Sequence, residues 1–585
     1  MLAKFFPWKF FLKRVSKAHG FIDPFALLTR FNRFSQPAEM VAPTELLRAG
    51  AVMHARGLLN SQAIQHNLDW VWPYWVCRQF DPESKSFVPR AFAIAHINLT
   101  HRNWTATGAP GMKKLPVVDP RGLVTPVFDG WSVDCWICDP DMENCIPAHL
   151  ETVKQEIRNS HSLQVVTSCS TENHQLNLRA EAHASGGLPV CIIHARGQTG
   201  SSRARLIVSL RPYNPEGISL LESIQPLNGV NGWLVNNKYQ VQLSDTPEQM
   251  RYSTYRQGDV FHRIFSGEGD RMRKAQCDIG MATAAAEFRL EKDREREISV
   301  TIPLQHRKET TPVSIDSGSS GERDVWRQSM NTVCRFSVPD EHYGFLYKNA
   351  LHTMLLHAPD DILAGPYTYN RFWFRDAVLV AHAMLVSGLH GTAQTAINRF
   401  PGRQNALGYF VSQEGEWDAN GQVLWIYDLT ARISGEAPGT KSLRNIIRAA
   451  DWICRKRISE NKDTPHAGLL PAGFSAEHFG PNDYYYWDDF WGIAGLRSAA
   501  RLLESSDPAR ARKYAQAARE LFEATGRSLA AVARRTDSSV MPVSPNRRPD
   551  SAAVGSLAAS YPLQLFAPRD SRLYETAEFL FDNCT

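Results

Sequence analysis

The pattern of apolar residues changes once along this chain, near residue 340, and that change constrains the fold more than any single motif. Between residues 85 and 305, short stretches rich in β-branched residues alternate apolar with polar positions, as half-buried strands do. They are SLQVVTSCS, HQLNLRAEAHA, LPVCIIHARG, RARLIVSLRPY, GWLVNNKYQVQL and REISVTIPL, with the turn sequences PEG, NGVNG and SGEGD among them. So many strands of antiparallel type predict a large two-sheet β-sandwich over residues 85–310.

Beyond residue 340 the apolar residues recur with helical spacing. We predict helices over 343–358, 376–388, 391–400, 421–434, 442–458, 488–504, 508–533, 551–566 and 571–584. Helices that follow one another in hairpins, joined by loops rich in aromatic and acidic residues, are typical of an α/α barrel or a solenoid, and no TPR or HEAT period is visible. The predicted fold class is therefore multidomain, with a β-sandwich followed by a helical domain over residues 343–585.

Two further segments complete the predicted domain organisation. The stretch KETTPVSIDSGSSGERD is polar and rich in Gly and Ser, so residues 311–342 are predicted to form a linker. Residues 1–84 form an N-terminal segment that contains the helix-like stretch APTELLRAGAVMHARGLL. Because residues 1–17 mix Lys and Arg with Phe and Trp, they are either a docked or mobile segment or an amphipathic anchor that contacts a membrane surface.

Charge and length exclude several classes of protein. The 65 Lys and Arg residues nearly balance the 60 Asp and Glu residues, which argues against nucleic acid as the main partner. A chain of 585 residues suggests two or three domains. No apolar run approaches the roughly eighteen residues of a transmembrane helix, and no secretory signal is recognisable at the N-terminus. We expect a protein of the reducing cytoplasm.

The cysteines raise the question of a metal site. Cys135, Cys138 and Cys145 cluster in WSVDCWICDPDMENC, which suggests zinc, but no second CxxC or HxxxH nearby completes four ligands. Buried free thiols on a strand are the preferred interpretation. Nothing in the sequence implies a metal or an organic cofactor.

Two segments of the helical half place charged and aromatic residues just before a predicted helix. In GPYTYNRFWFRDAVLVAHAML these are Trp373, Arg375 and Asp376, and in QEGEWDANGQVLWIYDL they include Glu416, Trp417 and Asp418. A carboxylate at this position is often only a helix cap, and an adjacent Arg is often only its ion-pair partner. Helix capping therefore remains an alternative to a functional role for each segment.

A third segment, GLLPAGFSAEHFGPNDYYYWDDFWGIAGLRSAARLL, is denser in aromatic and acidic residues. Glu477, His478, Tyr485, Trp487 and Asp488 are among them. So many aromatic side chains in one loop would be costly to expose unless they line a concavity. Aromatic faces stack on sugar rings, and carboxylates and amides bind sugar hydroxyls. Packing between helices and binding of another protein remain alternatives.

Taken together, the WxRD-type segment, the D-x-x-G-x-x-LW segment and GLLPxG…E-H-x-G resemble, in order and approximate spacing, the six-hairpin glycosidases. Within that superfamily the chain is most similar to the glucoamylase-like and glycogen-debranching branch, where a β-supersandwich precedes an (α/α)6 barrel. The resemblance covers residues 343–585, and for the sandwich it rests on domain order and strand content. It implies inverting hydrolysis of a terminal α-linked glucosyl unit in an oligosaccharide or polysaccharide.

Residue by residue, the resemblance implies that Glu477 is the general acid, with Asp418 as the alternative. Substrate contacts would come from the residues that share its motifs: Trp373, Arg375, Asp376, Glu416, Trp417, His478, Tyr485, Trp487 and Asp488. His478 departs from the pattern, because family members often have a second acid directly after the Glu.

The general base of this family sits near the end of the barrel, on a later helix hairpin. Only about nine of the twelve helices that close such a barrel are found before Thr585, so we expect the chain to be a truncated form that lacks the base. If the chain is complete, a non-catalytic carbohydrate-binding protein is the better interpretation. A disaccharide phosphorylase, which uses phosphate in place of the base, is a further alternative.

Overall fold

The computed structural model describes residues 44–87, 96–98, 104–159, 163–185, 187–265, 272–306, 320–413, 415–436, 439–460, 463–474 and 482–584. Residues 1–17, for which a docked or mobile segment and a membrane anchor were the alternatives, lie outside these ranges, as do Glu477 and His478. By its internal contacts the chain divides into two units. We call them the sandwich unit, Ala51–Phe372 with Val386–Ala396, and the helical unit, which comprises the described residues up to Gly50, Trp373–Leu385 and the described residues from Ile397 onward.

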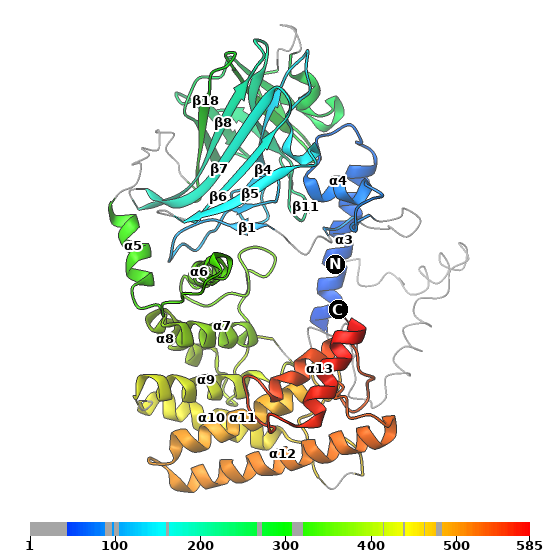
Figure 1. Ribbon diagram of the computed structural model, residues 1–585, viewed down its shortest axis with the longest axis vertical. Helices are drawn as coiled ribbons and strands as arrows, with labels where there is room; N and C mark the ends of the chain where they lie inside the picture. The colour runs from blue at the N-terminus through cyan, green and yellow to red at the C-terminus, as the bar shows by residue number, and fades with distance from the viewer. Residues whose placement is uncertain are drawn as a thin grey trace, which may run out of the picture. The chain divides into compact units, whose positions relative to one another are not determined.

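The sandwich unit is built on two large antiparallel sheets (Figure 1). One has the order β1 (Thr105–Ala106), β2 (Val117–Val118), β3 (Val124–Thr125), β4 (Ser132–Cys138), β9 (Arg205–Arg211), β17 (Thr283–Arg289), β15 (Gln249–Ser253). The other has the order β16 (Ala275–Gln276), β12 (Ser223–Pro226), β13 (Gly232–Val235), β14 (Tyr239–Leu243), β18 (Arg296–Pro303), β8 (Leu188–Thr199), β7 (His174–Ser185), β6 (Leu163–Ser170), β5 (Val153–Asn159). A two-stranded ribbon joins β10 (Tyr213–Asn214) to β11 (Gly217–Ile218).

Each of the quoted strand-like stretches becomes one or two of these strands, because the alternation marks the buried face. The turn NGVNG places Gly232 at φ +137°, where a Cβ atom would lie 1.9 Å from the carbonyl oxygen of Val241. Only glycine fits so close an approach between two paired strands. The cysteines of the suspected zinc cluster are buried free thiols, and Cys145 Sγ lies 3.6 Å from Cys169 Sγ.

Helices accompany the sheets, and the first of them, Thr44–Gln65, belongs to the sandwich unit from Ala51 onward. α3 (Thr44–Gln65) and α4 (Tyr74–Phe80) flank the segment with Trp70 and Trp72, whose rings stack 5.9 Å apart and pack in one core cluster with Tyr213 of β10. The 3₁₀ turns are Pro147–His149, Tyr255–Gln257 and Val260–Arg263. α5 (Ser320–Met330) lies within the range predicted as a linker, and α6 (Glu341–Leu356) and most of α8 (His390–Ile397) also group with the sandwich unit. The grouping by contacts thus differs from a division at residue 343.

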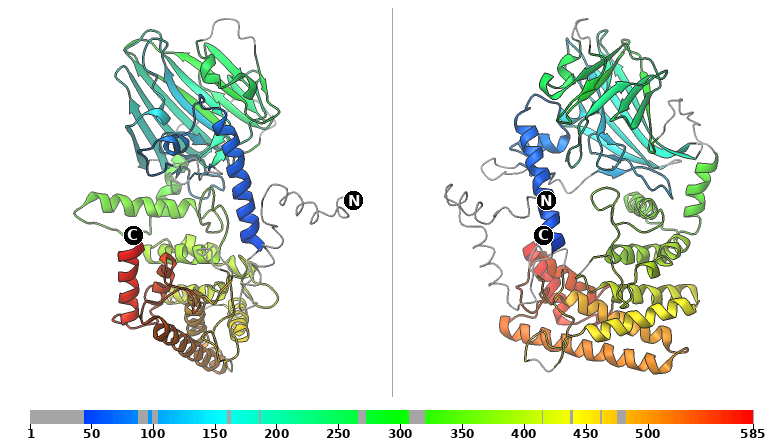
Figure 2. Two further views of the ribbon diagram at one scale, coloured as in Figure 1. Left: turned by 90° about the vertical axis from the view of Figure 1, so that its right-hand side faces the viewer. Right: turned by 180° about the vertical axis from the view of Figure 1, so that it is seen from behind.

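The helical unit contains α7 (Phe374–Ser387), α9 (Ala419–Ser434), α10 (Thr440–Lys456), α11 (Tyr486–Leu503), α12 (Pro508–Thr536) and α13 (Ser571–Cys584), with a 3₁₀ turn at Phe400–Arg403. The two views of Figure 2 show the yellow and orange helices α9 to α12 side by side. The helix predicted over 551–566 is wrong as an α-helix: a 3₁₀ helix spans Ser551–Ala559 and ends before Pro562. Pro562 lacks the N–H that an α-helix needs to continue, and Gly555 lowers helix propensity.

Within the described ranges, no helix combines the length and the apolar character that crossing a membrane requires. The predicted order, a β-sandwich followed by a helical domain, is confirmed.

Candidate active site

Three helices of the helical unit carry charged residues in or just before their first turns. Arg375 is the second residue of α7, Asp418 immediately precedes α9, and Asp488 is the third residue of α11. The N-terminal end of a helix carries a partial positive charge, which favours carboxylates there. Side-chain contacts through Glu416 and Trp487 join these turns into one cluster.

The first contact joins α7 to the loop before α9. Arg375 Nη1 lies 3.3 Å from Glu416 Oε1, and both side chains are largely buried, at 16% and 4% exposed. Arg375 also approaches its neighbour, with Nε 3.9 Å from Asp376 Oδ2. The Arg375 guanidinium thus lies near two carboxylates. It pairs with Asp376, as the helix-capping alternative expected, and also with Glu416.

The second contact joins α9 to α11. Asp418 is buried, and its Oδ2 atom accepts hydrogen bonds from Trp487 Nε1 at 2.7 Å and from Gln422 Nε2 at 2.8 Å. Its side chain makes no capping hydrogen bond to the backbone of α9. The capping interpretation of Asp418 is therefore wrong. Asn420, the second residue of α9, accepts a hydrogen bond from Phe410 N and donates to the carbonyls of Gly408 and Ala449.

Asp488 is the most electrostatically unusual member of the cluster. It is 3% exposed, and among the described residues its Oδ2 atom has no hydrogen-bond partner. Burial first, and then the negative charges of Asp418, Asp489 and Glu416, hold the pKa of Asp488 well above its usual range, while Arg375 opposes the shift. These carboxyl groups therefore lie close enough to interact, and Asp488 binds a proton more readily than an ordinary aspartate.

Tryptophan side chains lie at two of the same helix starts, Trp373 just before α7 and Trp487 in the first turn of α11. Trp373 Nε1 donates to Gln413 Oε1 at 3.0 Å, and Trp487 packs edge-on against Trp491 with ring centroids 5.7 Å apart. Trp373 and Trp487 are half-buried, so each retains some exposed surface. An aromatic surface beside carboxylates is the combination that sugar rings require.

Packing accounts for part of the aromatic content. Trp417 donates from Nε1 to the carbonyl of Ala472 at 3.1 Å, and its ring packs against Tyr409 and Trp452. The ammonium of Lys456 lies 4.0 Å from the centroid of the Trp417 ring. Tyr485 is buried too, with the Arg547 guanidinium 5.8 Å from its ring. Trp417 and Tyr485 thus make packing contacts, and their predicted role in substrate binding stays a prediction.

The sequence reasoning missed several residues that hold the cluster in place. Tyr409 donates from its hydroxyl to the carbonyl of Glu416 at 2.6 Å, which positions the loop that carries Glu416 and Asp418. Gln422 could have been found, because it lies four residues after Asp418 on α9, a spacing at which helical side chains meet. No local pattern marks Tyr409, which lies in a loop before the motif.

The third segment is anchored at both sides of residues 475–481, which lie outside the described residues together with Glu477 and His478. Gly473 and Asp483 pair through backbone hydrogen bonds of 2.8 and 3.0 Å. The buried carboxylate of Asp483 accepts from Ser544 Oγ at 2.7 Å, Asn546 Nδ2 at 2.9 Å and Arg547 Nε at 3.2 Å. Asp483, which carries no predicted role, is a structural residue that joins the start of α11 to residues 544–547.

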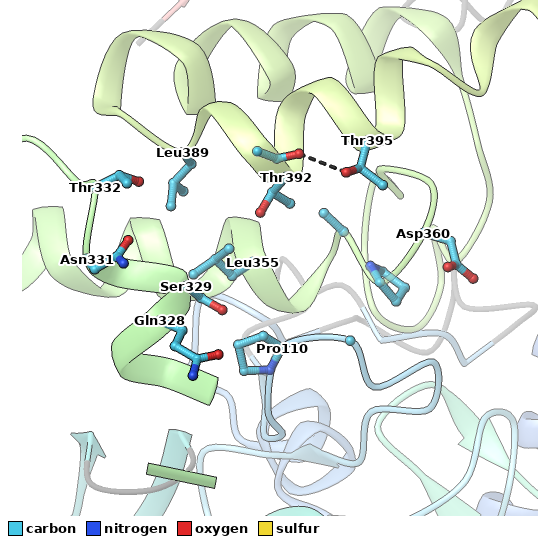
Figure 3. Close-up of a pocket in the computed structure, with 14 residues that line it drawn as sticks. Pro110, Gln328, Ser329, Asn331, Thr332, Leu355, Asp360, Leu389, Thr392 and Thr395 are labelled. Carbon is cyan, nitrogen blue, oxygen red and sulfur yellow. Dashed lines mark hydrogen bonds between the residues drawn. The ribbon is translucent and has the colours of Figure 1, made fainter. Parts of the chain in front are cut away.

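Within the described part of the chain, no three His, Cys, Asp or Glu side chains are arranged to hold a metal ion. The cavity drawn in Figure 3 is not at the carboxylate cluster. It belongs to the sandwich unit and measures about 410 Å³, with residues of α5, α6 and α8 in its wall.

No protein-family model and no curated protein sequence matches the chain. Solved structures match at low identity. A bacterial glucoamylase complexed with acarbose is 12% identical, with a TM-score of 0.53 over 72% of this chain and 67% of that chain. A rhamnosidase from Klebsiella oxytoca with rhamnose bound is 11% identical, with a TM-score of 0.40 over 74% of this chain and 80% of that chain. An α-mannosidase from Bacteroides thetaiotaomicron is 9% identical, with a TM-score of 0.32 over 78% and 76% of the two chains.

The match to the glucoamylase structure establishes the fold. The chain shares with that structure a fold in which a β-sandwich lies N-terminal to a helical domain, as the sequence predicted.

Proposed function

We propose, from the six-hairpin glycosidase fold and the carboxylate cluster, that the chain is a glycoside hydrolase acting on a terminal α-linked glucosyl unit with inversion. The observation that carries the proposal is the convergence of Glu416, Asp418 and Asp488 with Arg375 and Trp487 at the N-terminal turns of α7, α9 and α11. Buried carboxylates and one guanidinium supply directed acceptors and donors for sugar hydroxyls, and the tryptophans supply an apolar face.

The proposed roles follow the chemistry of inverting hydrolysis. One carboxylic acid protonates the leaving oxygen while a carboxylate activates a water on the opposite face of the sugar, about 6.5–9.5 Å away. Glu477 is proposed as the acid. Asp418 is less suited to that role than the resemblance implied, because two N–H groups already donate to its Oδ2 atom. We propose instead that Asp418 and Arg375 bind sugar hydroxyls, and we assign the base to no residue.

The test is hydrolysis of maltotriose, followed by NMR of the anomer released. Inversion predicts β-glucose as the first product. Glu477→Gln is expected to lower kcat by about 10²–10⁴-fold, as loss of a general acid does, while the melting temperature stays unchanged. Full activity of Glu477→Gln would remove Glu477 from the role of acid. Release of glucose 1-phosphate only when phosphate is added would identify a phosphorylase instead.

A non-catalytic carbohydrate-binding protein is the second candidate, and His478 favours it because that position often carries an acid in the family. Its signature would be thermal stabilisation by maltotriose without turnover. Arg375→Ala should weaken maltotriose binding whether or not the sugar is cleaved. This variant therefore checks the location of the binding site under both candidate functions.

A further inference from the structure

The sandwich unit contains a second cavity, of about 570 Å³, which no residue of the carboxylate cluster lines, although Gly365–Tyr369 begin the segment that continues to Arg375. Its wall contains β1, Ile157 of β5, Leu163 at the start of β6, the end of α6 and the loop 364–369. The lining residues are Trp104, Thr105, Ala106, Ile157, Leu163, Thr353, Leu356, His357, Ala364, Gly365, Pro366, Tyr367, Thr368 and Tyr369. The volume lies within the range of about 300–1,000 Å³ that is typical of small-molecule sites.

The lining is uncharged and aromatic. None of the lining side chains is an Asp, Glu, Lys or Arg, so a charged ligand would find no counter-ion in the wall. Trp104 packs edge-on against Tyr367 with ring centroids 5.9 Å apart, and Tyr369 is 48% exposed. A half-exposed aromatic wall without charge is suited to a neutral ligand that has apolar faces.

Polar groups in the wall are available to such a ligand. Among the described residues, neither the His357 ring nor the Thr105 hydroxyl has a hydrogen-bond partner. Burial lowers the pKa of His357 to about 4, so at neutral pH its ring carries one donor and one acceptor. The Thr353 hydroxyl donates to the carbonyl of Asn349 at 2.8 Å and retains acceptor capacity. These groups match the hydroxyls of a sugar, each of which both donates and accepts.

The loop that lines the cavity is held in shape. Gly365 N donates to the carbonyl of Tyr369 at 3.0 Å, and Asn370 N donates to the carbonyl of Tyr367 at 3.0 Å. The Thr368 hydroxyl also donates to Glu216, in the turn between β10 and β11. A loop tied by its own backbone loses little conformational entropy when a ligand binds. The cavity is therefore largely pre-formed.

The cavity in Figure 3 makes an instructive contrast. Its wall includes Leu355, Leu389 and Thr392, but no aromatic side chain, and Asp360 at its edge pairs with Lys113 at 2.5 Å. It therefore lacks the stacking surface of the larger cavity.

We propose that the cavity lined by Trp104, His357 and Tyr369 is a second carbohydrate-binding site, for a neutral α-glucosyl oligosaccharide. The choice of ligand class rests on the proposed function, whereas the site itself belongs to the other unit and shares no residue with the carboxylate cluster. Tyr369 and Trp104 present their rings to the apolar face of a pyranose, and His357 and Thr105 bind its hydroxyls.

The test is calorimetric titration of the full chain with maltotriose, in a Glu477→Gln background so that the sugar is not consumed. The parent protein is expected to bind at two sites, and Arg375→Ala should weaken one of them. Trp104→Ala and Tyr369→Ala should each weaken the other by at least about tenfold, since a lost stacking contact of about 1.4 kcal/mol corresponds to that factor. Tyr574→Ala, which removes an exposed ring from α13, is the matched control and should change neither site.

The outcomes separate the two proposals. If maltotriose is hydrolysed by the unmodified chain but Trp104→Ala and Tyr369→Ala bind it as the parent does, the second site is refuted and the proposed function stands. If the unmodified chain neither binds nor cleaves maltotriose, the proposed function fails and the second site fails with it. Because Tyr369 is half exposed, its replacement keeps the test valid should Trp104→Ala fold poorly.

Discussion

At the scale of single residues, the carboxylate cluster brings together more negative than positive charges in a buried region. Glu416, Asp418 and Asp488 are buried together, and one guanidinium, that of Arg375, lies among them. If all three carboxyl groups were ionised, two negative charges would remain uncompensated in a region of low dielectric. A proton on Asp488 relieves part of this repulsion, which is the physical reason for its raised pKa. Under the proposed function, the neutral hydroxyls of a sugar can bind beside these carboxyl groups without adding a further charge.

The raised pKa of Asp488 predicts a pH-dependent effect on stability. The folded state binds this proton more tightly than the unfolded state, so the residue costs increasing stability as pH rises from its ordinary value toward its folded pKa. Asp488→Asn mimics the protonated acid and should stabilise the chain at pH 8 relative to pH 4, by on the order of 1 kcal/mol or more. Urea unfolding at the two pH values measures this.

Asp489→Asn is the matched comparison for that experiment. Burial raises the pKa of Asp489 to about 8, and the variant should likewise gain stability as pH rises, because an Asn oxygen still accepts from Leu470 N. An Asp488→Asn stability change that is the same at pH 4 and pH 8 would contradict the assignment of the proton to Asp488.

Trp487→Phe tests the hydrogen bond between α11 and α9. The substitution keeps an aromatic ring but removes the N–H that donates to Asp418 Oδ2 at 2.7 Å. We expect a loss of about 1.5–3 kcal/mol in the free energy of unfolding, as for other hydrogen bonds to charged groups, together with weaker maltotriose binding. Wild-type stability and affinity in this variant would show that Asp418 does not depend on Trp487.

At the scale of elements, close packing of α9 against α11 sets the separation between Asp418 and Asp488. A Cβ atom on Gly421 would lie 2.1 Å from the carbonyl oxygen of Trp491, and one on Gly495 would lie 2.5 Å from Gly421 Cα. The two helices therefore meet backbone to backbone at glycines, one turn into α9 from the cluster. Glycine at these positions costs helix propensity, and the close approach requires it.

Gly421→Ala is expected to force the two helices apart. Overpacking of this kind costs about 1–3 kcal/mol of stability, and binding of maltotriose should weaken because Asp418 and Trp487 separate. Gly526→Ala in α12 is the control, because no atom lies within 4 Å of the added Cβ, and it should stabilise the chain by about 0.5–1 kcal/mol. Thermal unfolding of both variants distinguishes them, and a stabilised Gly421→Ala would refute the packing argument.

At the scale of the whole molecule, both units bring together segments that lie far apart in sequence. The candidate site combines residues 373–376, 413–422 and 483–491. In the sandwich unit, Arg211 and Asp259 form a fully buried ion pair, with Arg211 Nη1 2.7 Å from Asp259 Oδ1. Asp259 Oδ2 also accepts from Val71 N at 2.8 Å, which ties the segment after α3 to the sheets. The tryptophan-rich segment depends on this pair for its position.

Asp259→Asn should destabilise the chain by about 3–5 kcal/mol, because it leaves the buried Arg211 charge uncompensated. Glu291→Gln makes the same chemical change in an exposed pair with Arg294 and should fall within about 0.5 kcal/mol of wild type. Denaturant unfolding of the two variants provides the measurement, and equal stabilities would contradict the importance of the buried pair.

The sequence by itself determined the elements and their order. Alternation marked β6, β7, β8 and β18, helical spacing placed the starts of α6 to α13 within two residues, and the motifs identified Arg375, Asp418 and Asp488 as site candidates. These properties are readable because periodicity and turn chemistry are local.

Only the tertiary structure decided which candidates meet. It showed that Asp418 binds Trp487 in place of capping α9, that Trp417 and Tyr485 pack against neighbouring side chains, and that α5 and α6 group with the sandwich unit. It also showed the 3₁₀ helix that ends before Pro562 and the aromatic cavity beside α6. The burial of a side chain and its dielectric environment arise from packing between elements. So does the contact between Asp418 and Trp487, which are 69 residues apart in the sequence. No local pattern of residues encodes these properties.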